Sequence, residues 1–275
     1  MRFEILTIFP GFFDGIFEYG IVRRARANGL VSVGVHDLRA FAHDAHRTVD
    51  DRPFGGGEGM VLKPEPLAEA LASLGVGPRA ANQPAEIVQS GTRVVLLSAQ
   101  GRPLTQAIVR ELATADRVVL ICGRYEGVDE RINEIYCDME LSIGDYVLSG
   151  GELAAAVVVD ATMRIVPGVL GNAASHEFES FGLRDEDIFT ASNEIPRSQH
   201  GAGGLLDYPH YTRPVEFGGL RTPDVLLSGD HGQIRKWRRQ QQLQKTLRNR
   251  PDLLERAQLT DEERRLLESI RGSAG

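Results

Sequence analysis

The feature that most constrains this fold is a pair of short aliphatic runs near the middle of the chain. Residues Arg93 to Ser98 read Arg-Val-Val-Leu-Leu-Ser, and residues Arg117 to Cys122 read Arg-Val-Val-Leu-Ile-Cys. Short runs rich in β-branched residues are typical of strands that are buried on both faces. A helix-like segment from Thr105 to Ala115 separates them, so the pattern predicts two strands paired in parallel at the centre of a sheet.

The N-terminal residues predict a second β-α-β unit. Met1 to Phe9 has the apolar pattern of a covered strand, Phe12 to Ala27 is compatible with a helix that ends at Asn28-Gly29, and Leu30 to Leu38 resumes as a strand. The expected fold class is therefore α/β, with a parallel sheet and helices on both of its faces.

Polar, glycine-containing loops follow three of the predicted strands. They comprise Ser98 to Thr105, Gly123 to Asp129, and Gly144 to Gly151, the last after a strand near Glu140 to Ile143 and before a helix from Glu152 to about Ile165. In open α/β sheets, ligands bind beyond the carboxyl ends of the strands. These loops are therefore the leading candidate for a binding site, although each alone could be an ordinary βα turn.

The C-terminal third has a different character. Regular periodicity fails from Gly171 to about Leu205, which predicts a linker or mobile lid. The residues from Pro223 onward look helical, and Thr260 with Glu263 forms a capping-box pattern that should begin the last helix. We therefore expect three parts: residues 1–170, a flexible linker at 171–206, and a small helical domain at 207–275.

Charge and hydropathy restrict the partners. The net charge of -7 argues against indiscriminate binding to polyanions, but no acid occurs between His231 and Arg250, a stretch with seven cations around Trp237. Such a patch suits phosphate contacts with an aromatic surface for stacking, or is simply a solvated helix face. No apolar stretch approaches the ~20 residues of a membrane span, so we expect a cytoplasmic protein without membrane contact.

Several familiar sites are missing from the sequence. There is no Gly-x-Gly-x-x-Gly after a strand, no Walker A lysine loop and no serine nucleophile elbow. His36, His43 and His46 are spaced irregularly, and Cys122 and Cys137 lack metal-ligand spacing. We expect no protein-bound structural metal and two reduced, partly buried thiols.

Taken together, the longer motifs resemble one family closely: the bacterial tRNA (guanine-N1)-methyltransferases of the TrmD type, within the knotted SPOUT class. The resemblance covers almost the whole chain and is carried by segments that are long and specific in composition. These segments are His46 to Pro66, Leu97 to Pro103, Gly123 to Gly127, Ile143 to Leu148, Pro167 to Gly171, Asp207 to Pro214, Val225 to Gly229, and Trp237-Arg238.

The resemblance implies a deep trefoil knot that holds the methyl donor S-adenosylmethionine. By motif match, the residues around the cofactor would be Ser98, Gly123, Tyr125, Glu126, Ile143, Gly144, Asp145, Tyr146, Val147, Leu148, Gly150 and Gly151. Glycine-rich loops let backbone amides and carbonyls approach an adenine without side-chain bulk. The family usually has proline after the serine, where this chain has Ala99.

For catalysis, the resemblance implies methylation of N1 of the guanosine immediately 3′ of the anticodon (position 37). Guanine N1 carries a proton, so a carboxylate must accept it, and a cation near O6 would stabilise the developing negative charge. Arg164 matches the family's arginine, and Glu179 matches the family's aspartate base, with Asp207 as a second candidate for the base or for an orienting partner. Glutamate adds one carbon–carbon bond, ~1.5 Å of reach.

The linker departs further from the family pattern. Here 22 residues, Gly182 to Gly203, separate Phe181 from the next matching segment, where the family commonly has a couple. We expect a longer lid that is disordered without RNA. Proteins similar to this one are homodimers with a shared active site, in which the basic C-terminal domain grips the tRNA anticodon arm.

Two other functions remain open at this point. The chain could be an RNA-binding protein of the same fold without catalysis, or a related methyltransferase that acts on another RNA. The resemblance also leaves open whether Mg²⁺ assists, and it assigns no residue to the ion.

Overall fold

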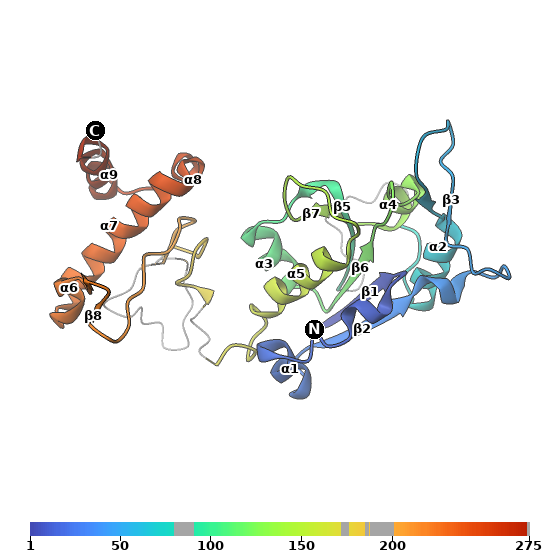
Figure 1. The fold of residues 1–275 in the computed structure, drawn as a ribbon, viewed down its shortest axis with the longest axis horizontal. Coiled ribbons are helices and arrows are strands. Elements are labelled where there is room, and N and C mark those ends of the chain that lie inside the picture. The colour runs from blue at the N-terminus through green and yellow to red at the C-terminus, as the bar shows by residue number, and fades with distance from the viewer. Residues whose placement is uncertain (80–90, 172–175, 185–186, 188–200, 274–275) are drawn as a thin grey trace. The chain divides into compact units, whose positions relative to one another are not determined.

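The computed structural model describes residues 1–79, 91–171, 176–184, 187 and 201–273. The chain divides into two compact units, Met1–Leu170 and Gly171–Gly275 (Figure 1). Each unit has its own core and is described by itself. The boundary falls where strand and helix periodicity ends in the sequence.

The first unit is built on a five-stranded parallel sheet in the order β2-β1-β6-β5-β7. The strands are β1 (Arg2–Thr7), β2 (Ser32–Asp37), β5 (Thr92–Pro103), β6 (Arg117–Cys122) and β7 (Met139–Ser142). The two aliphatic runs are neighbours in parallel, as predicted, and β6 lies at the centre of the sheet. The expected α/β class with a parallel sheet is confirmed.

Each central strand sends alternate side chains to opposite faces of the sheet. In β6, Val118, Leu120 and Cys122 belong to one buried cluster, while Val119 and Ile121 belong to another. Helices α1 (Gly20–Ala27), α3 (Gln106–Ala113) and α5 (Glu152–Met163) contribute to the first cluster, and α2 (Pro64–Ser73) and α4 (Glu130–Tyr136) to the second. Figure 1 shows α3 and α5 on one side of the strands and α2 on the other.

Short elements complete this unit. The 3-10 turns η1 (Pro10–Phe13) and η2 (Leu38–Phe41) follow β1 and β2, and a small antiparallel pair joins β3 (Asp50–Asp51) to β4 (Val61–Leu62). The helix predicted from Phe12 to Ala27 is shorter in the structure. It begins only at Gly20, and its C-cap is Asn28, as expected.

Strand β5 differs from the prediction. The residues after Ser98 were expected to leave the sheet as a loop, but the strand continues to Pro103 across an irregularity. Both Leu97 and Arg102 align with Leu141 of β7, so the residues between them bulge out of register. A Cβ atom at Gly101 would lie 2.5 Å from the backbone of Leu141, which explains the glycine at this close approach.

The second unit contains a small antiparallel pair and four helices among its described residues. The pair is β8 (Glu216–Phe217) with β9 (Leu220–Arg221), which the sequence did not predict. The helices are α6 (Asp224–Leu227), α7 (His231–Asn249), α8 (Pro251–Arg256) and α9 (Asp261–Ser273). The predicted capping box is confirmed, because Thr260 N donates to Glu263 Oε2 at 2.8 Å and Glu263 N donates to Thr260 Oγ1 at 3.3 Å.

Two segments on either side of the long insertion pair with each other. Phe181 N donates to Leu205 O at 2.8 Å, Gly204 N to Gly182 O at 3.0 Å, and Gly203 N to Leu183 O at 3.1 Å. The expected lid itself lies mostly outside the described residues. Its two ends are nevertheless joined, so the chain returns to its starting point after the insertion.

Candidate functional site

A cavity of about 350 Å³ opens at the carboxyl ends of β6 and β7, beside the bulge of β5. This is the edge at which α/β sheets bind ligands, and the volume is within the range of small-molecule sites. Its walls are the bulged part of β5 around Ser98 and the two loops at Gly123–Val128 and Ile143–Gly151.

Eleven of the twelve residues predicted to surround a cofactor line this one cavity. They are Ser98, Gly123, Tyr125, Glu126, Ile143, Gly144, Tyr146, Val147, Leu148, Gly150 and Gly151. The exception is Asp145, which is exposed and is not part of the lining. The lining also includes polar residues that the sequence did not single out, among them Gln100, Glu130, Glu140 and Ser142.

Glycines let two of the loops touch. Gly151 N donates to Gly123 O at 2.9 Å, and Arg124 forms an isolated antiparallel bridge with Gly150. A Cβ atom at Gly151 would lie 2.7 Å from Cys122 Cα, closer than any ordinary contact. The absence of side chains at these positions is therefore a condition of the cavity's shape.

A buried ion pair fastens the same loops to the sheet. The Arg124 guanidinium approaches the Glu152 carboxylate at 2.8 Å, and these side chains are 18% and 2% exposed. Glu152 also accepts a hydrogen bond of 2.7 Å from Thr7 Oγ1, and Arg124 donates to Ser149 O at 2.8 Å. The guanidinium stacks over the Phe9 ring, 4.5 Å from its centroid. Replacing either Arg124 or Glu152 by a neutral residue would leave the other charge uncompensated in the wall of the cavity.

Sequence reasoning missed this cluster because its members are far apart in the chain. Thr7 and Glu152 are separated by 145 positions, so no single local motif contains both. The one available signal was a charged residue, Glu152, at the start of a mostly apolar helix.

Tyr125 lies in the cavity wall in a left-handed backbone conformation, with φ of 59°. The hydrogen bond with Asp50 is the main cause that raises the pKa of the Tyr125 phenol above its usual value, with burial as a second cause. The neighbouring residue contacts the segment before β4, since Glu126 N donates to Met60 O at 3.0 Å.

Both cysteines are buried, as the sequence indicated. Burial, reinforced by the charge of Glu152, raises the pKa of the Cys122 thiol far above its usual range. Burial likewise raises the pKa of Cys137 to about 12. Neither thiol is a nucleophile under ordinary conditions.

The three predicted catalytic residues are divided between the units. Arg164 ends helix α5 in the first unit. Glu179 and Asp207 belong to the second unit. The paired segments bring Asp207 next to the residue that follows Glu179, because Asp207 N donates to Ser180 Oγ at 2.9 Å. Asp207 Oδ2 also lies within hydrogen-bond distance, 3.0 Å, of Nε2 of His210, a residue that sequence reasoning did not single out.

The predicted basic patch on α7 is only partly available to a ligand. Arg239 is 12% exposed and forms an ion pair of 2.6 Å with Glu263, so it does not present its charge to solvent. Lys236 and Arg248, in contrast, are exposed. The interpretation of all seven cations as phosphate contacts is therefore wrong for Arg239.

The described part of the chain offers neither a metal centre nor a membrane-spanning helix. No group of three or more His, Cys, Asp or Glu side chains there could hold a metal ion. No helix in the described part of the chain is both long enough and apolar enough to cross a membrane.

Comparison with known proteins agrees with the motifs. A profile of the family described as tRNA (Guanine-1)-methyltransferase TrmD matches residues 1–256. A tRNA (guanine-N(1)-)-methyltransferase of Koribacter versatilis is 52% identical over 271 residues, covering 98% of both chains.

Two further relatives carry the same name. The one from Geobacter metallireducens is 46% identical and covers 97% of this chain and 96% of its own, and the one from Moorella thermoacetica is 47% identical over 98% and 96%. Identity at this level over nearly full lengths, with the strand-end cavity, leads to one conclusion. The chain belongs to the tRNA (guanine-1)-methyltransferase TrmD family.

Proposed function

We propose that this protein transfers the methyl group of S-adenosylmethionine to N1 of guanine in tRNA, at the position immediately 3′ of the anticodon. The observation that carries the proposal is the strand-end cavity, whose glycine-containing walls lie within the residues that match the family. A cytoplasmic location suits a tRNA substrate and is part of the proposal.

The residues of the cavity fit the cofactor. Side chains at Gly150 and Gly151 would collide with Arg124 and Cys122, so glycine at these positions keeps two walls of the cavity close together. Tyr146 and Val147 are exposed at the rim and offer apolar surface. When bound, S-adenosylmethionine supplies an electrophilic methyl group on a sulfonium.

The protein's own task is to remove a proton. Guanine N1 has no lone pair for attack until its proton leaves, and a carboxylate within hydrogen-bond reach can accept that proton. We assign this role to Glu179, with Asp207 as the orienting partner beside it. Arg164 would stabilise the negative charge that spreads to O6.

These residues need not come from one chain. We propose a homodimer in which the first unit of one subunit and the second unit of its partner form the active site. Exposed apolar side chains support the presence of an interface on the first unit, including Phe12 and Ile16 near η1 and Leu153 and Val157 on α5. The trefoil knot is likewise a proposal, and it rests on family membership.

The tRNA anticodon arm would lie along the exposed cations of the second unit. Of the seven predicted cations, Lys236 and Arg248 are exposed on α7 and carry this part of the proposal. The double variant Lys236→Glu with Arg248→Glu should weaken tRNA binding and reduce its dependence on salt, since fewer counterions are released.

The direct test is methylation of unmodified tRNA transcripts followed by nucleoside analysis for 1-methylguanosine. We expect product with wild type and with transcripts that carry guanosine next to the anticodon, and none when that guanosine is replaced. Glu179→Ala should abolish turnover but bind S-adenosylmethionine like wild type in a calorimetric titration. Wild-type protein that neither binds the methyl donor nor modifies tRNA would refute the proposal.

A further inference from the structure

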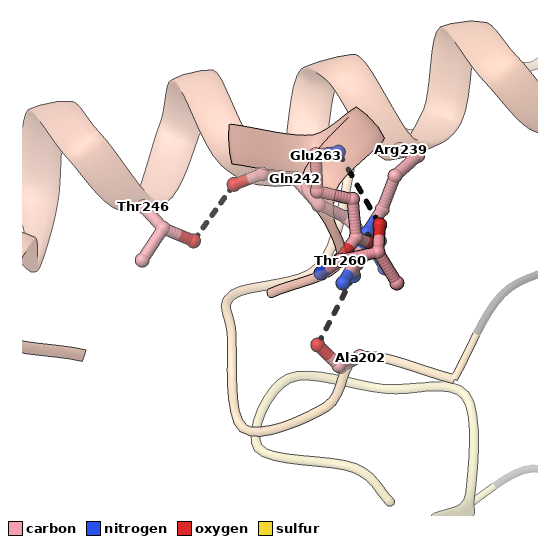
Figure 2. Close-up of polar contacts among 6 residues, drawn as sticks. All are labelled: Ala202, Arg239, Gln242, Thr246, Thr260 and Glu263. Atoms are coloured by element: carbon pink, nitrogen blue, oxygen red, sulfur yellow. Dashed lines mark hydrogen bonds and ion pairs between the residues drawn. The ribbon is translucent and has the colours of Figure 1, made fainter. Parts of the chain in front are cut away.

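A polar network joins α7 and α9 to the segment that leads into Asp207. Figure 2 shows Arg239, Gln242 and Thr246 on α7, Thr260 and Glu263 at the start of α9, and Ala202 on the adjoining segment. Arg239 donates to Ala202 O at 3.2 Å and to Gln242 Oε1 at 3.0 Å, and its Nε donates to Glu263 Oε1 at 2.6 Å. One guanidinium therefore connects three parts of the second unit.

Thr246 makes a second connection a little farther along α7. Its hydroxyl donates to Gln242 O at 2.7 Å and accepts a hydrogen bond of 3.0 Å from Leu206 N. Ala202, Gln242 and Thr246 are fully buried, so these bonds are shielded from water. In such surroundings, leaving a backbone N–H without a hydrogen-bond partner costs free energy of folding. The Thr246 hydroxyl therefore favours the one position of Leu206 in which this bond forms.

Two further contacts hold the same segment. Leu205 is fully buried in the core formed by α7, α8 and α9. Tyr208 is 4% exposed, and its ring lies under the Arg238 guanidinium, 4.6 Å from Cζ to the centroid. Residues 202–208 are thus attached to α7 at Ala202, Leu206 and Tyr208, and the last two of these flank Asp207.

The attachment extends to Glu179 through the paired segments. Phe181 is bonded to Leu205 through the backbone, and Ser180 Oγ accepts a hydrogen bond from Asp207 N. The contacts that hold residues 202–207 on α7 therefore also restrict the position of Glu179, through its neighbours Ser180 and Phe181. The long insertion begins after Leu183 and ends before Gly203, which are hydrogen-bonded to each other, so the pairing of residues 181–183 with 203–205 is not interrupted.

We propose that Thr246 and Arg239, with Gln242 and Glu263, are positioning residues that set the location of Glu179 and Asp207 for proton removal. They do not touch the guanine themselves. This inference rests on the proposed function. Helix α7 would then have two roles: its exposed cations would bind RNA, and its buried polar residues would position Glu179 and Asp207. The second role explains why Arg239 forms an ion pair with Glu263.

The electrostatics favour a charged network. Burial opposes ionisation of Glu263, but the Arg239 charge and the hydrogen bonds from Thr260 and Arg239 outweigh it, and the pKa of Glu263 lies below its usual value. The ion pair is therefore maintained throughout the neutral range.

The test uses the full-length protein and the variants Thr246→Val and Thr246→Ser. Valine keeps the shape of threonine but removes the acceptor for Leu206 N, whereas serine retains it. We expect Thr246→Val to lower the single-turnover methylation rate at least about tenfold, because small displacements of a reacting group have large kinetic effects. Thr246→Ser should recover the rate to within about threefold, and binding of S-adenosylmethionine should be unchanged in both.

The control variant for a general loss of stability is Val22→Ala, which removes core packing on α1 in the first unit and involves none of the contacts of residues 202–208. It should lower the melting temperature without lowering the rate measured well below that temperature. If Val22→Ala loses as much activity as Thr246→Val at equal stability, or if Thr246→Val is as active as wild type, the positioning role is overturned.

Hydrogen exchange tests the attachment without relying on activity. Peptides that cover residues 201–207 should exchange at least about tenfold faster in Thr246→Val than in wild type. Unchanged exchange would contradict the attachment itself. Wild type that does not methylate tRNA would instead refute the proposed function, so the two failures are distinguishable.

Discussion

Replacing Gly151 by alanine is the sharpest perturbation of the strand-end cavity. The new Cβ would lie 2.7 Å from Cys122 Cα and 3.0 Å from Gly123 N, both of them backbone atoms. The shorter distance is about 0.7 Å inside ordinary van der Waals contact, so the two loops must separate. Separation would strain the hydrogen bond of 2.9 Å from Gly151 N to Gly123 O.

The magnitude follows from these two effects. Overpacking of a well-packed site costs roughly 1–3 kcal/mol, and a lost hydrogen bond about 1 kcal/mol. The free energy of unfolding should therefore fall by about 2–4 kcal/mol, which lowers the melting temperature by roughly 5–15 °C in a chain of this size. Because the loops form the cavity wall, affinity for S-adenosylmethionine should fall at least about tenfold.

Differential scanning fluorimetry and calorimetric titration measure the two effects. Gly77→Ala is the matched control, since a Cβ at that position meets no atom within 4 Å. It should match wild type in both assays. If Gly151→Ala melted and bound the methyl donor like wild type, the contact between these loops would be wrong.

Three further predictions concern other parts of the molecule. Cys122 and Cys137 should resist iodoacetamide at pH 8 in the native protein and react once it is unfolded by guanidinium; mass spectrometry that found rapid native labelling would contradict their burial. The pKa of Glu263 is lower in the folded state than in the unfolded chain, so its contribution to stability is present above pH of about 4.3 and is lost as the pH falls through the folded pKa. Urea unfolding should therefore show Glu263→Gln less stable than wild type at pH 7, with a difference that narrows in acid; a gap that stayed constant would exclude the charge as its source. Replacing residues 185–200 by a short glycine-serine turn should change the free energy of unfolding by less than about 1 kcal/mol, because Leu183 and Gly203 are already paired, and a large loss of helical signal on denaturant titration would disprove this.

Much of the first unit could be predicted from local pattern. Alternation in the run Val118 to Cys122 reflects the two covered faces of β6, and the polar loop that follows marks the edge where ligands bind. The position of the cavity was predictable because parallel strands must all end at the same edge. The specific function came from long motifs, since many unrelated activities use α/β sheets.

Other features had no local signal. The β5 strand continues past Ser98 because β7 pairs with it twice around a bulge, and a propensity argument cannot detect a partner strand. Arg239 looked like one of seven equivalent cations until α9 placed Glu263 beside it.

The sequence by itself determined where strands, helices and glycine loops occur, because each depends on neighbouring residues and on the periodicity of a buried face. Only the tertiary structure decided which distant groups meet. Thr7, Arg124 and Glu152 form one buried cluster, and the residues around Phe181 and Leu205 pair across a long insertion. Such contacts depend on the path of the whole chain, and their energies come from burial and complementary charge, which no local stretch of sequence contains.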